Sequence, residues 1–453
     1  MPFADALGPR RVRIGVTGLA RSGKTALLTS IAANLLALGA GRPALPALAA
    51  RLGGRRVRVA TAPAAATGLP RFDVSRHLAA LVADPPRWPE RTEAASLLAL
   101  DLDLPRAGLA ASLPPRRLRL EFLDYPGEWL LDLPLLARSF AEWSAAALRR
   151  LEAPETAPVA RDFLGFLRGL PAAAPGDETL AATGHALYRT ALHRLRDEVG
   201  LSFLQPGRFL MPAPGPEPPW MAFFPMTGGG PLAGLLRARF DAYLQAVRRD
   251  LVSPLFGDLD RLVVLADVLA ALHAGPAAFA DAAAALGAAS EALRWRRGWA
   301  DWLGWETLEA LLALRLPSFG ISRVAYVATK ADHVAARQRG NLAALTRRLT
   351  AAPREGVASA AFAVAAVRCT EDVVETLEGR PVSAVRGRRL PDGRMLRSYP
   401  GEVPDTPPDA AFWAHPFLDL PVFEPVRPPD VGRGGVPQIG LDEMLGFLLE
   451  DLL

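Results

Sequence analysis

Apolar and polar positions at the start of the chain follow two different periodicities. β-Branched residues fill 12–17 and predict a buried strand, whereas the apolar residues of 25–38 recur at helical spacing and predict a helix. The Gly-, Pro- and Ala-rich segment 41–73 indicates irregular structure, and a further helix is expected around 74–83. Strand, glycine loop and helix in this order are typical of the start of an α/β domain.

A different pattern fills the middle of the chain. Amphipathic helical periodicity is found in three segments, 135–151, 179–199 and 234–251. The Pro- and Gly-rich segment 204–231 between the last two cannot form a regular helix. We therefore predict that residues 133–257 form a mainly helical insertion.

Apolar runs typical of buried strands return in the last part of the chain, at 259–269, 323–332 and 362–372. Helical sequence lies between the first two. Within 380–404 the turn sequence Pro-Asp-Gly predicts a hairpin, and the apolar spacing of 438–453 predicts a closing helix. These strands are expected to belong to the same sheet as the first one.

The length of 453 residues suits two or three structural units. We predict a discontinuous α/β domain, residues 1–132 and 258–453, in which helices cover both faces of a mixed, mostly parallel sheet, and the helical insertion. The single cysteine, Cys369, excludes a disulfide framework and fits a reducing compartment. Because no N-terminal signal segment and no run of about eighteen apolar residues is found, we expect a soluble cytoplasmic protein.

The charge pattern argues against a specific nucleic-acid partner. A net charge of +5 is mild for this length, and the arginines are spread along the chain without an aromatic platform or a zinc module, so solvated surface arginine is the favoured interpretation. Of the 52 basic residues only Lys24 and Lys330 are lysines, and each lies in a short motif. A compact ammonium group fits beside phosphates where a planar guanidinium has a different geometry.

The first motif is Gly-Leu-Ala-Arg-Ser-Gly-Lys-Thr, residues 18–25, between the predicted strand and helix. Its spacing, G-x-x-x-x-G-K-[ST], is that of a phosphate-binding loop, in which backbone N–H groups and a helix N-terminus converge on an anion. Lys24 is expected to reach the β- and γ-phosphates, and the Thr25 hydroxyl to bind Mg²⁺. The alternative is an ordinary glycine turn that carries a lysine.

A carboxylate follows the second strand of a predicted hairpin. In 84–104 a proline-rich loop leads into an alternating apolar run, and in 116–128 apolar residues alternate with charged ones, which predicts a half-buried strand; we expect the two strands to form a hairpin. The second strand ends at Asp124, and Gly127 follows three residues later, which gives the pattern D-x-x-G. In a protein with a phosphate loop, such an aspartate bonds Mg²⁺ through its water shell and the glycine N–H senses the γ-phosphate.

The motif Thr-Lys-Ala-Asp, ending at Asp332, indicates which nucleotide is bound. A carboxylate at this position can accept from both N1–H and the N2 amine of guanine, a contact that adenine cannot make. Lys330 would lie along the base or over the phosphate loop; a solvated strand end is the alternative for this motif. A loop near Val367, Arg368 and Cys369 is expected to support the base, although it has no sharp chemical requirement.

Six segments together resemble the YcjX-like proteins, the domain-of-unknown-function 463 family, and the longest shared block is 123–136. The segments are "TGLARSGKTA", "WPERT", "LDYPGEWLLDLPLL", "DRLVVLADVL", "VATKADH" and "YPGEVP". The resemblance runs from the phosphate loop to the C-terminal helix. It implies a GTPase with a Ras-like nucleotide domain and a helical domain, in a family linked by genomic setting to phage-shock or envelope stress responses.

The resemblance also implies roles for individual residues. The phosphate loop consists of Gly18, Arg21, Ser22, Gly23, Lys24, Thr25 and Ala26; the γ-phosphate switch of Asp124 and Gly127; and the guanine site of Thr329, Lys330 and Asp332. Thr92 takes the place of the first-switch threonine that completes Mg²⁺ coordination, with a surface threonine as the alternative.

Two residues depart from the Ras-like pattern. Glu128 stands where many such proteins have a glutamine that orients the attacking water. Thr329 replaces the commoner asparagine, so a weaker hold on the phosphate loop is expected. Arg91 beside Thr92 is a candidate arginine finger, although a solvated surface arginine is the favoured interpretation among so many arginines.

The leading hypothesis is a Mg²⁺-dependent switch that hydrolyses GTP slowly to GDP and phosphate and moves the helical domain. The main alternative is a module whose partner binding is gated by guanine nucleotide, with negligible hydrolysis; the partner cannot be named from the sequence. A small-molecule kinase is disfavoured because the Thr-Lys-Ala-Asp motif would then lack a role.

The segment 294–305 interleaves four tryptophans with arginines. Trp295, Trp299 and Trp302 would share one helical face, and Trp305 would extend it. A stripe packed into the core is the favoured interpretation. The alternative is a surface that contacts a protein partner or, peripherally, an anionic membrane.

Overall fold

The computed structural model describes most of the chain as two compact units. The described residues are 9–19, 21–63, 69–90, 95–106, 112, 114–211, 215–252, 259–294, 320–351, 356–415, 417, 420–428 and 434–453. The sheet unit contains those within Met1–Tyr125, Leu259–Gly275 and Gly320–Leu453, and the helical unit contains those within Pro126–Asp258 and Pro276–Phe319. Residues 126–132 and 276–294 thus lie with the helical unit, whereas the predicted insertion covered 133–257 only.

A seven-stranded mixed sheet forms the centre of the sheet unit. Its order is β2-β3-β4-β1-β5-β6-β7, and all neighbours from β4 to β7 are parallel, whereas β2 and β3 run antiparallel to their neighbours. The strands are β1 (Arg10–Gly18), β2 (Arg58–Thr61), β3 (Ser96–Leu104), β4 (Arg116–Asp124), β5 (Arg261–Ala266), β6 (Arg323–Thr329) and β7 (Ala358–Val364). The predicted first strand, the β3–β4 hairpin and the mostly parallel sheet are confirmed.

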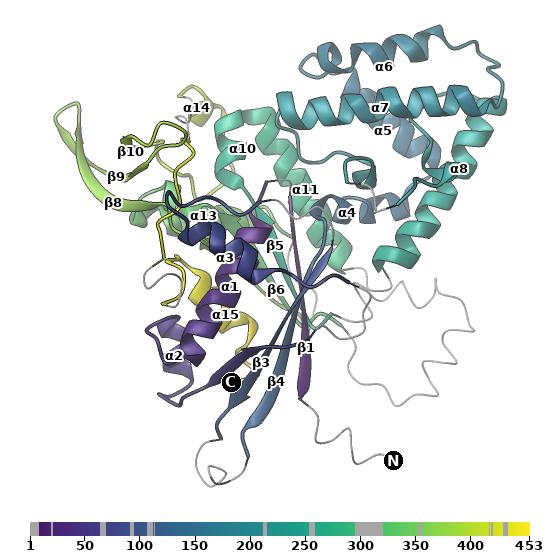
Figure 1. Cartoon of the computed structure of the whole chain (residues 1–453). Helices are drawn as coiled ribbons and strands as arrows, with labels where there is room; N and C mark the ends of the chain where they lie inside the picture. Colours follow the sequence, from purple (N-terminus) through teal and green to yellow (C-terminus); the bar gives the residue numbers. More distant parts are fainter. Residues whose placement is uncertain are drawn as a thin grey trace, which may run out of the picture. The chain divides into compact units, whose positions relative to one another are not determined.

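Helices from both ends of the sequence complete one core against this sheet. Leu27 and Ile31 of α1 (Lys24–Gly39) and Leu445 of α15 (Leu441–Leu448) share a buried cluster with β1, β3 and β4. The carboxylate of Asp442 accepts from the Ala47 and Leu48 N–H groups at the start of α2 (Pro46–Arg51). In Figure 1 the purple α1 and α2 accordingly lie beside the yellow α15.

The remaining helices of the sheet unit are short. They are α3 (Val74–Val82), α10 (Val268–Ala274), α13 (Arg339–Arg348) and α14 (Ala410–Trp413), with 3-10 turns at Ala331–His333 and Ala336–Gln338. The helices expected at 25–38, around 74–83 and within 438–453 are confirmed. The prediction for 41–73 was incomplete, because this segment contains α2 and the edge strand β2. Leu48 of α2 is buried in the sheet core, so tertiary packing orders a weakly patterned segment.

The three strands predicted in the last part of the chain were too long, and β6 ends at Thr329 rather than at 332. The run 259–269 ends as a strand at Ala266, and Asp267 then caps α10. The run 362–372 was wrong as one strand: β7 ends at Val364, and Thr370 begins β8 (Thr370–Leu377) of a separate sheet. A continuous apolar run does not by itself reveal where a buried strand gives way to a helix or a loop.

The separate sheet is antiparallel and three-stranded, in the order β10-β9-β8. Strand β9 (Arg380–Arg388) pairs with β10 (Met395–Ser398), so the hairpin predicted from the Pro-Asp-Gly turn is confirmed. Figure 1 shows this sheet as a long curved ribbon in light green.

The helical unit is built around aromatic side chains. Trp143 is 1% exposed, and its ring lies 5.1 Å from that of Phe240 and 5.5 Å from that of Phe223. The helices are α4 (Gly127–Leu130), α5 (Phe140–Leu151), α6 (Ala157–Gly169), α7 (Glu178–Glu198), α8 (Pro231–Val247) and α11 (Pro276–Arg294), with 3-10 turns at Leu133–Ala137, Gly207–Phe209 and Pro219–Met221 and a π turn at Arg248–Val252. The three predicted helices are confirmed, and α6 is additional.

None of the helices in the described part of the chain combines the length and apolarity needed to cross a membrane. Residues 295–305 lie outside the described residues, so the prediction for their tryptophans, core or surface, stays a prediction.

Candidate functional site

Glycine and positive backbone angles shape the loop between β1 and α1. A Cβ atom on Gly18 would lie 2.6 Å from the Leu265 carbonyl oxygen, so a larger residue would clash with strand β5. The Leu19 N–H donates to that same oxygen at 2.9 Å. Arg21 and Gly23 have φ angles of 61° and 81°, a region that costs a non-glycine residue free energy. The loop therefore turns sharply from strand to helix.

The N-terminus of α1 is suited to an anion. The helix begins at Lys24, and the glycine at its N-cap contributes no side-chain hydrogen bond to the first turn. Uncapped N–H groups and the helix dipole together favour a negatively charged ligand. Lys24 Nζ lies 3.4 Å from the Gly18 carbonyl oxygen, across the loop. The Ser22 hydroxyl is buried and has no hydrogen-bond partner among the described residues.

Asp124 lies beside this loop. It ends β4 directly opposite Val16 of β1, two residues before Gly18, and it is 4% exposed. On its other side Ser96 begins β3, and the buried Ser96 hydroxyl has no partner within the described part of the chain. The sheet thus places Asp124 at the end of β4, beside the end of β1 from which the loop Gly18–Thr25 leaves. Carboxylate and hydroxyl oxygens are hard donors of the kind that Mg²⁺ prefers.

Gly127 and Glu128 begin α4 in the helical unit, and both are buried. The Glu128 backbone is packed tightly there, since a Cβ atom on Gly207 would lie 1.8 Å from the Glu128 carbonyl oxygen. The predicted roles of these two residues beside a γ-phosphate stay predictions. Arg91 and Thr92 lie outside the described residues, so the roles proposed for them are untested as well.

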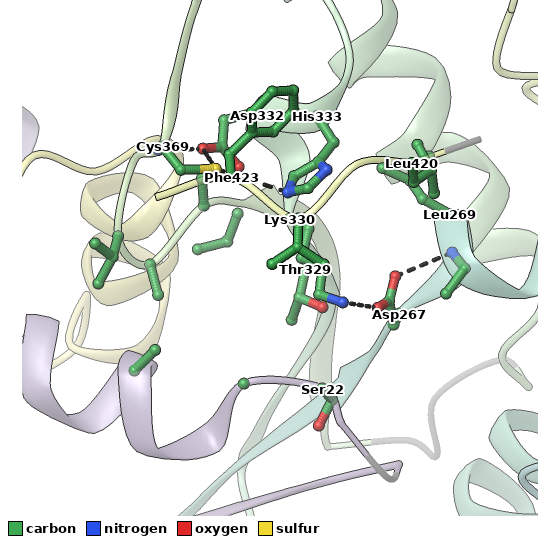
Figure 2. Close-up of a pocket in the computed structure, with 18 of the residues that line it drawn as sticks. Ser22, Asp267, Leu269, Thr329, Lys330, Asp332, His333, Cys369, Leu420 and Phe423 are labelled. Carbon is green, nitrogen blue, oxygen red and sulfur yellow. Dashed lines mark hydrogen bonds and ion pairs between the residues drawn. The ribbon is translucent and has the colours of Figure 1, made fainter. Parts of the chain in front are cut away.

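The Thr-Lys-Ala-Asp motif follows β6 and fixes a buried carboxylate. Lys330 adopts a left-handed conformation with φ 58°, and the chain then forms the short 3-10 turn that contains Asp332. Asp332 is 1% exposed, and its Oδ2 accepts from the Cys369 N–H at 2.6 Å and from the Cys369 thiol at 3.0 Å. The Thr370 hydroxyl donates to the Asp332 carbonyl oxygen. Figure 2 shows the Asp332 and Cys369 side chains facing each other.

The other two polar residues of the motif contact strand β5 and the residue after it. Lys330 Nζ forms an ion pair with the carboxylate of Asp267, as Figure 2 shows. Asp267 also accepts from the Ala270 N–H at 3.0 Å and so caps α10. The Thr329 hydroxyl donates to the Ala266 carbonyl oxygen at 3.3 Å. Thr329 thus bonds the backbone of the neighbouring strand.

One cavity connects these groups. Its volume is about 360 Å³, and it reaches from the phosphate loop to Asp332, a size within the range of small-molecule sites. The lining residues are Ser22, Gly23, Ala26, Leu27, Trp88, Leu265, Asp267, Leu269, Ala270, His273, Thr329, Lys330, Asp332, His333, Val364, Ala365, Ala366, Val367, Cys369, Leu420, Pro421, Val422 and Phe423. The first and last predicted motifs, about 300 residues apart, therefore open on the same space.

A family comparison decides what kind of chain this is. The model of the YcjX-like family, domain of unknown function 463, matches residues 12–453. The chain belongs to this family. It is 36% identical over 464 aligned positions to the Ras-like GTPase YcjX of Escherichia coli, which covers 98% of this chain and 96% of that protein. It is 31% identical over 473 positions to the Ras-like GTPase YcjX of Shewanella oneidensis, with 98% and 95% covered.

In this YcjX-like chain the thiol of Cys369 acts as a hydrogen-bond donor. Burial, followed by the nearby Asp332 charge, raises the pKa of Cys369 well above its ordinary value. Burial lowers the pKa of His333, whose Nε2 lies 3.6 Å from the Cys369 sulfur. Ligand atoms of Asp332, His333 and Cys369 lie within 4.8 Å of one another. A protonated thiol that already donates to the carboxylate favours a fixed Asp332 over a metal site.

The loop that contains Val367 and Arg368 is held by the end of the chain. Val367 is buried and lines the cavity, whereas the Arg368 guanidinium donates to the Thr370 carbonyl oxygen at 2.7 Å. The Arg368 N–H donates to the Pro437 carbonyl oxygen at 2.8 Å. Val367 and Cys369 thus border the cavity next to Asp332, and the predicted role of this loop in supporting a base stays a prediction.

Sequence reasoning missed several residues that border the cavity. Asp267 had a signal, because it is a carboxylate directly after a buried apolar strand, as Asp124 is. Trp88 lies in the segment Trp-Pro-Glu-Arg-Thr that carries the family resemblance, but nothing in that segment assigned it to the base site; Phe423 had no signal, because it lies in a Pro-rich loop outside every motif. Only the folded chain brings them to the same cavity.

Proposed function

We propose that this chain binds GTP with Mg²⁺, hydrolyses it slowly to GDP and phosphate, and couples the bound nucleotide to movement of the helical unit, in a stress response. The observation that carries the proposal is the cavity that joins a phosphate-loop sequence to the buried carboxylate of Asp332. Two relatives with near full-length coverage, each named a Ras-like GTPase, support it.

Base selection is assigned to Asp332. Both of its described protein donors, the N–H and the thiol of Cys369, bond Oδ2, and among the described residues no donor bonds Oδ1. The carboxylate therefore keeps acceptor capacity toward the cavity, for the N1–H and N2–H₂ groups of guanine. Adenine would leave Oδ1 of this buried carboxylate without a donor, and such a mismatch is strongly selected against.

Triphosphate binding is assigned to the loop Gly18–Thr25 and the start of α1. The helix N-terminus supplies N–H groups, and Lys24 supplies a point charge that can leave the Gly18 carbonyl when a phosphate enters. Thr25 and Asp124 would hold Mg²⁺, with Thr92 as the proposed third contact. When bound, the ion would neutralise developing negative charge on the phosphates.

Hydrolysis is expected to be slow. Glu128 cannot donate as an amide does, so water would lack the usual orienting group, and turnover should lie well below the enzyme median of about 10 s⁻¹. Arg91 is a candidate arginine finger that would stabilise charge on the γ-phosphate. The test compares the single-turnover rate of GTP hydrolysis by Arg91→Ala with that of the wild type.

The proposed switch is supported by where the D-x-x-G residues lie along the chain. Asp124 and Tyr125 end the sheet unit, and Pro126 and Gly127 begin the helical unit. A change at a γ-phosphate that moved Gly127 would therefore act on α4. This helix is tied to its own unit by the Trp129 indole N–H, which donates to the Met211 carbonyl oxygen at 2.8 Å.

The alternative function is a guanine-gated binding module with negligible hydrolysis. The absence of a glutamine at position 128 favours it. Titration of the purified full-length protein with GTP, GDP and ATP, with and without Mg²⁺, tests nucleotide binding first. Single-turnover hydrolysis of GTP then separates the two functions. Equal affinity for ATP and GTP would refute the guanine assignment. If the amount of bound GTP stays constant for hours in the single-turnover experiment, the chain is a binding module.

A further inference from the structure

Two aromatic residues to which the sequence analysis gave no role border the proposed base site. Trp88 and Phe423 line the same cavity as Thr329, Lys330 and Asp332. Phe423 is 1% exposed, and its ring lies 5.5 Å from that of His333. Figure 2 shows Phe423 beside Asp332 and Cys369. The side of the cavity near the buried carboxylate is therefore aromatic and apolar.

Phe423 belongs to a segment, residues 420–426, that is held in place by backbone hydrogen bonds; we call it the C-terminal strap. The Glu424 N–H donates to the Arg388 carbonyl oxygen at 2.7 Å, and the Val426 N–H donates to the Arg368 carbonyl oxygen at 2.8 Å. The Val422 carbonyl oxygen accepts from the Leu390 N–H at 2.8 Å. The strap is thus fixed both to the end of β9 and to the loop below the base site.

Trp88 connects the strap to the other walls of the cavity. Its indole Nε1–H donates to the Phe423 carbonyl oxygen at 2.7 Å. Trp88 packs against a buried cluster formed by Ala33 of α1, Leu81, Val367 of the supporting loop and Val436, and Ala26 at the start of α1 packs against the same cluster. Three segments that the nucleotide would touch therefore meet at one tryptophan.

We propose that Trp88 and Phe423 form an aromatic wall against which the purine base packs, which makes Trp88 a nucleotide-binding residue. This inference rests on the proposed function and adds a contact to it. Aromatic rings bind the flat faces and edges of bases without selecting among them, so the wall contributes affinity while Asp332 contributes selectivity. Trp88 lies four residues before Thr92, the proposed Mg²⁺ contact. A base packed on Trp88 would therefore contact the same segment of chain that supplies this Mg²⁺ contact.

The test is equilibrium binding of GDP to the full-length protein and to Trp88→Ala, Trp88→Phe and Trp413→Phe. Loss of a base-stacking ring raises Kd by roughly 5- to 150-fold, which is the expectation for Trp88→Ala. Trp88→Phe keeps a ring but loses the N–H donor, so a rise of roughly fivefold is expected. Trp413 lies in α14 of the same unit and is not among the cavity-lining residues, so its variant should bind like the wild type.

A second readout distinguishes contact with the base from a purely structural role. Guanine quenches indole emission on contact, so GDP should change the tryptophan emission of the wild type and of Trp413→Phe but not that of Trp88→Phe. Circular dichroism and melting temperatures verify that each variant is folded. The GTP-to-ATP preference of Trp88→Ala should equal that of the wild type.

Two results would overturn the wall. The first is Trp88→Ala and Trp88→Phe binding GDP within twofold of the wild type. The second is a nucleotide-induced emission change that survives in Trp88→Phe. If instead the wild type itself binds no guanine nucleotide, the proposed function fails and the wall fails with it, so the two failures are told apart by the wild-type titration.

Discussion

Two buried aspartates, Asp332 in the sheet unit and Asp132 in the helical unit, have similar exposure and different surroundings. Asp132 is 0% exposed; its Oδ1 accepts from the Gly207 N–H at 2.7 Å, and its Oδ2 accepts from the Tyr243 hydroxyl at 2.5 Å. Asp332 has both of its described protein donors on one oxygen, and it borders a cavity of about 360 Å³. Burial alone does not separate the two.

The distribution of donors explains the difference. Both carboxylate oxygens of Asp132 accept hydrogen bonds from residues of the helical unit, Gly207 and Tyr243 of α8. These bonds join the turn at Gly207 to α8, so we interpret Asp132 as structural. Burial nevertheless raises the pKa of Asp132 to about 6, although both hydrogen bonds act in the opposite direction. Asp332 accepts on Oδ2 alone from its donors in the described part of the chain. A buried carboxylate therefore indicates a binding site when its hydrogen bonds are incomplete and face open space.

The contrast between Asp332 and Asp132 depends on a phosphate site at the other end of the Asp332 cavity, so the largest expected effect tests that site. Lys24→Ala removes the point charge at the other end and is expected to weaken GTP binding by about 3 kcal/mol, or roughly 100-fold. Lys24→Arg should also bind poorly, because the planar guanidinium has a different geometry. Titration with a fluorescent GTP analogue measures both. Tight binding by the alanine variant would remove the phosphate loop from the proposed site.

The next largest effect concerns the two aspartates directly. Asp332→Asn presents an amide donor where guanine also donates, so the ratio of GTP to ATP affinity should fall by roughly 10- to 100-fold. Asp132→Asn is the matched control, because it makes the same chemical change in the helical unit and should leave the ratio unchanged. Competition binding with both nucleotides measures the ratio. An unchanged preference in Asp332→Asn would place base selection elsewhere.

Asp132 should instead control how stability depends on pH. Its pKa in the folded protein is about 6 against 3.8 as the ordinary value, so the folded state holds the proton longer than the unfolded state. The stability that this proton contributes is complete below about pH 4 and is lost as the pH rises through about 6, in total on the order of 3 kcal/mol.

Asp132→Asn lacks this titration. Relative to the wild type, the variant should therefore gain stability as the pH rises from 4.5 to 7.5, in urea unfolding of the full-length protein followed by circular dichroism. A stability difference that is independent of pH would show that Asp132 titrates normally in the folded state.

The smallest expected effect concerns Cys369. Because burial raises the pKa of the Cys369 thiol, little thiolate forms at pH 7.5, and alkylation by iodoacetamide should be slow in the folded protein and fast in urea. GTP should slow the reaction in the folded state further, since Cys369 lines the cavity. Mass spectrometry of the single cysteine measures the rate. Rapid labelling of the folded protein would contradict the hydrogen-bonded thiol that fixes Asp332.

Most of the central sheet could be predicted because its strands are buried on both faces and their apolar runs are long. Strand β5 is buried throughout. In β4 the alternation separates the buried Leu118 and Leu120 from the half-buried Arg119, but it fails at Glu121, which is buried as well. The boundaries after Ala266 and Val364 could not be predicted, because the same apolar character continues into α10 and into the loop that supports Asp332. Strand β2 has no apolar pattern and exists because it pairs with β3.

The candidate site divides in the same way. The loop Gly18–Thr25 could be predicted from the sequence because a phosphate loop is one contiguous turn of backbone, and the spacing of its glycines and lysine reflects the geometry of that turn. For the Asp332 motif, the sequence predicts a carboxylate that can bind guanine, but it does not predict which residues surround that carboxylate. The Cys369 donors, the Lys330 partner Asp267 and the Trp88–Phe423 pair come from segments tens to hundreds of residues away.

The sequence by itself determined the family, the order of strands and helices around the phosphate loop, and the residue types offered to phosphate and base. Only the tertiary structure decided that the loop after β1 and the Asp332 motif border one cavity, that the described donors to Asp332 bond one oxygen while those to Asp132 bond both, and that Phe423 of the C-terminal strap lines this cavity. The physical reason is that local periodicity reports the burial of each segment. Partners that are distant in sequence are chosen by packing and by hydrogen bonds that form only when the chain is folded.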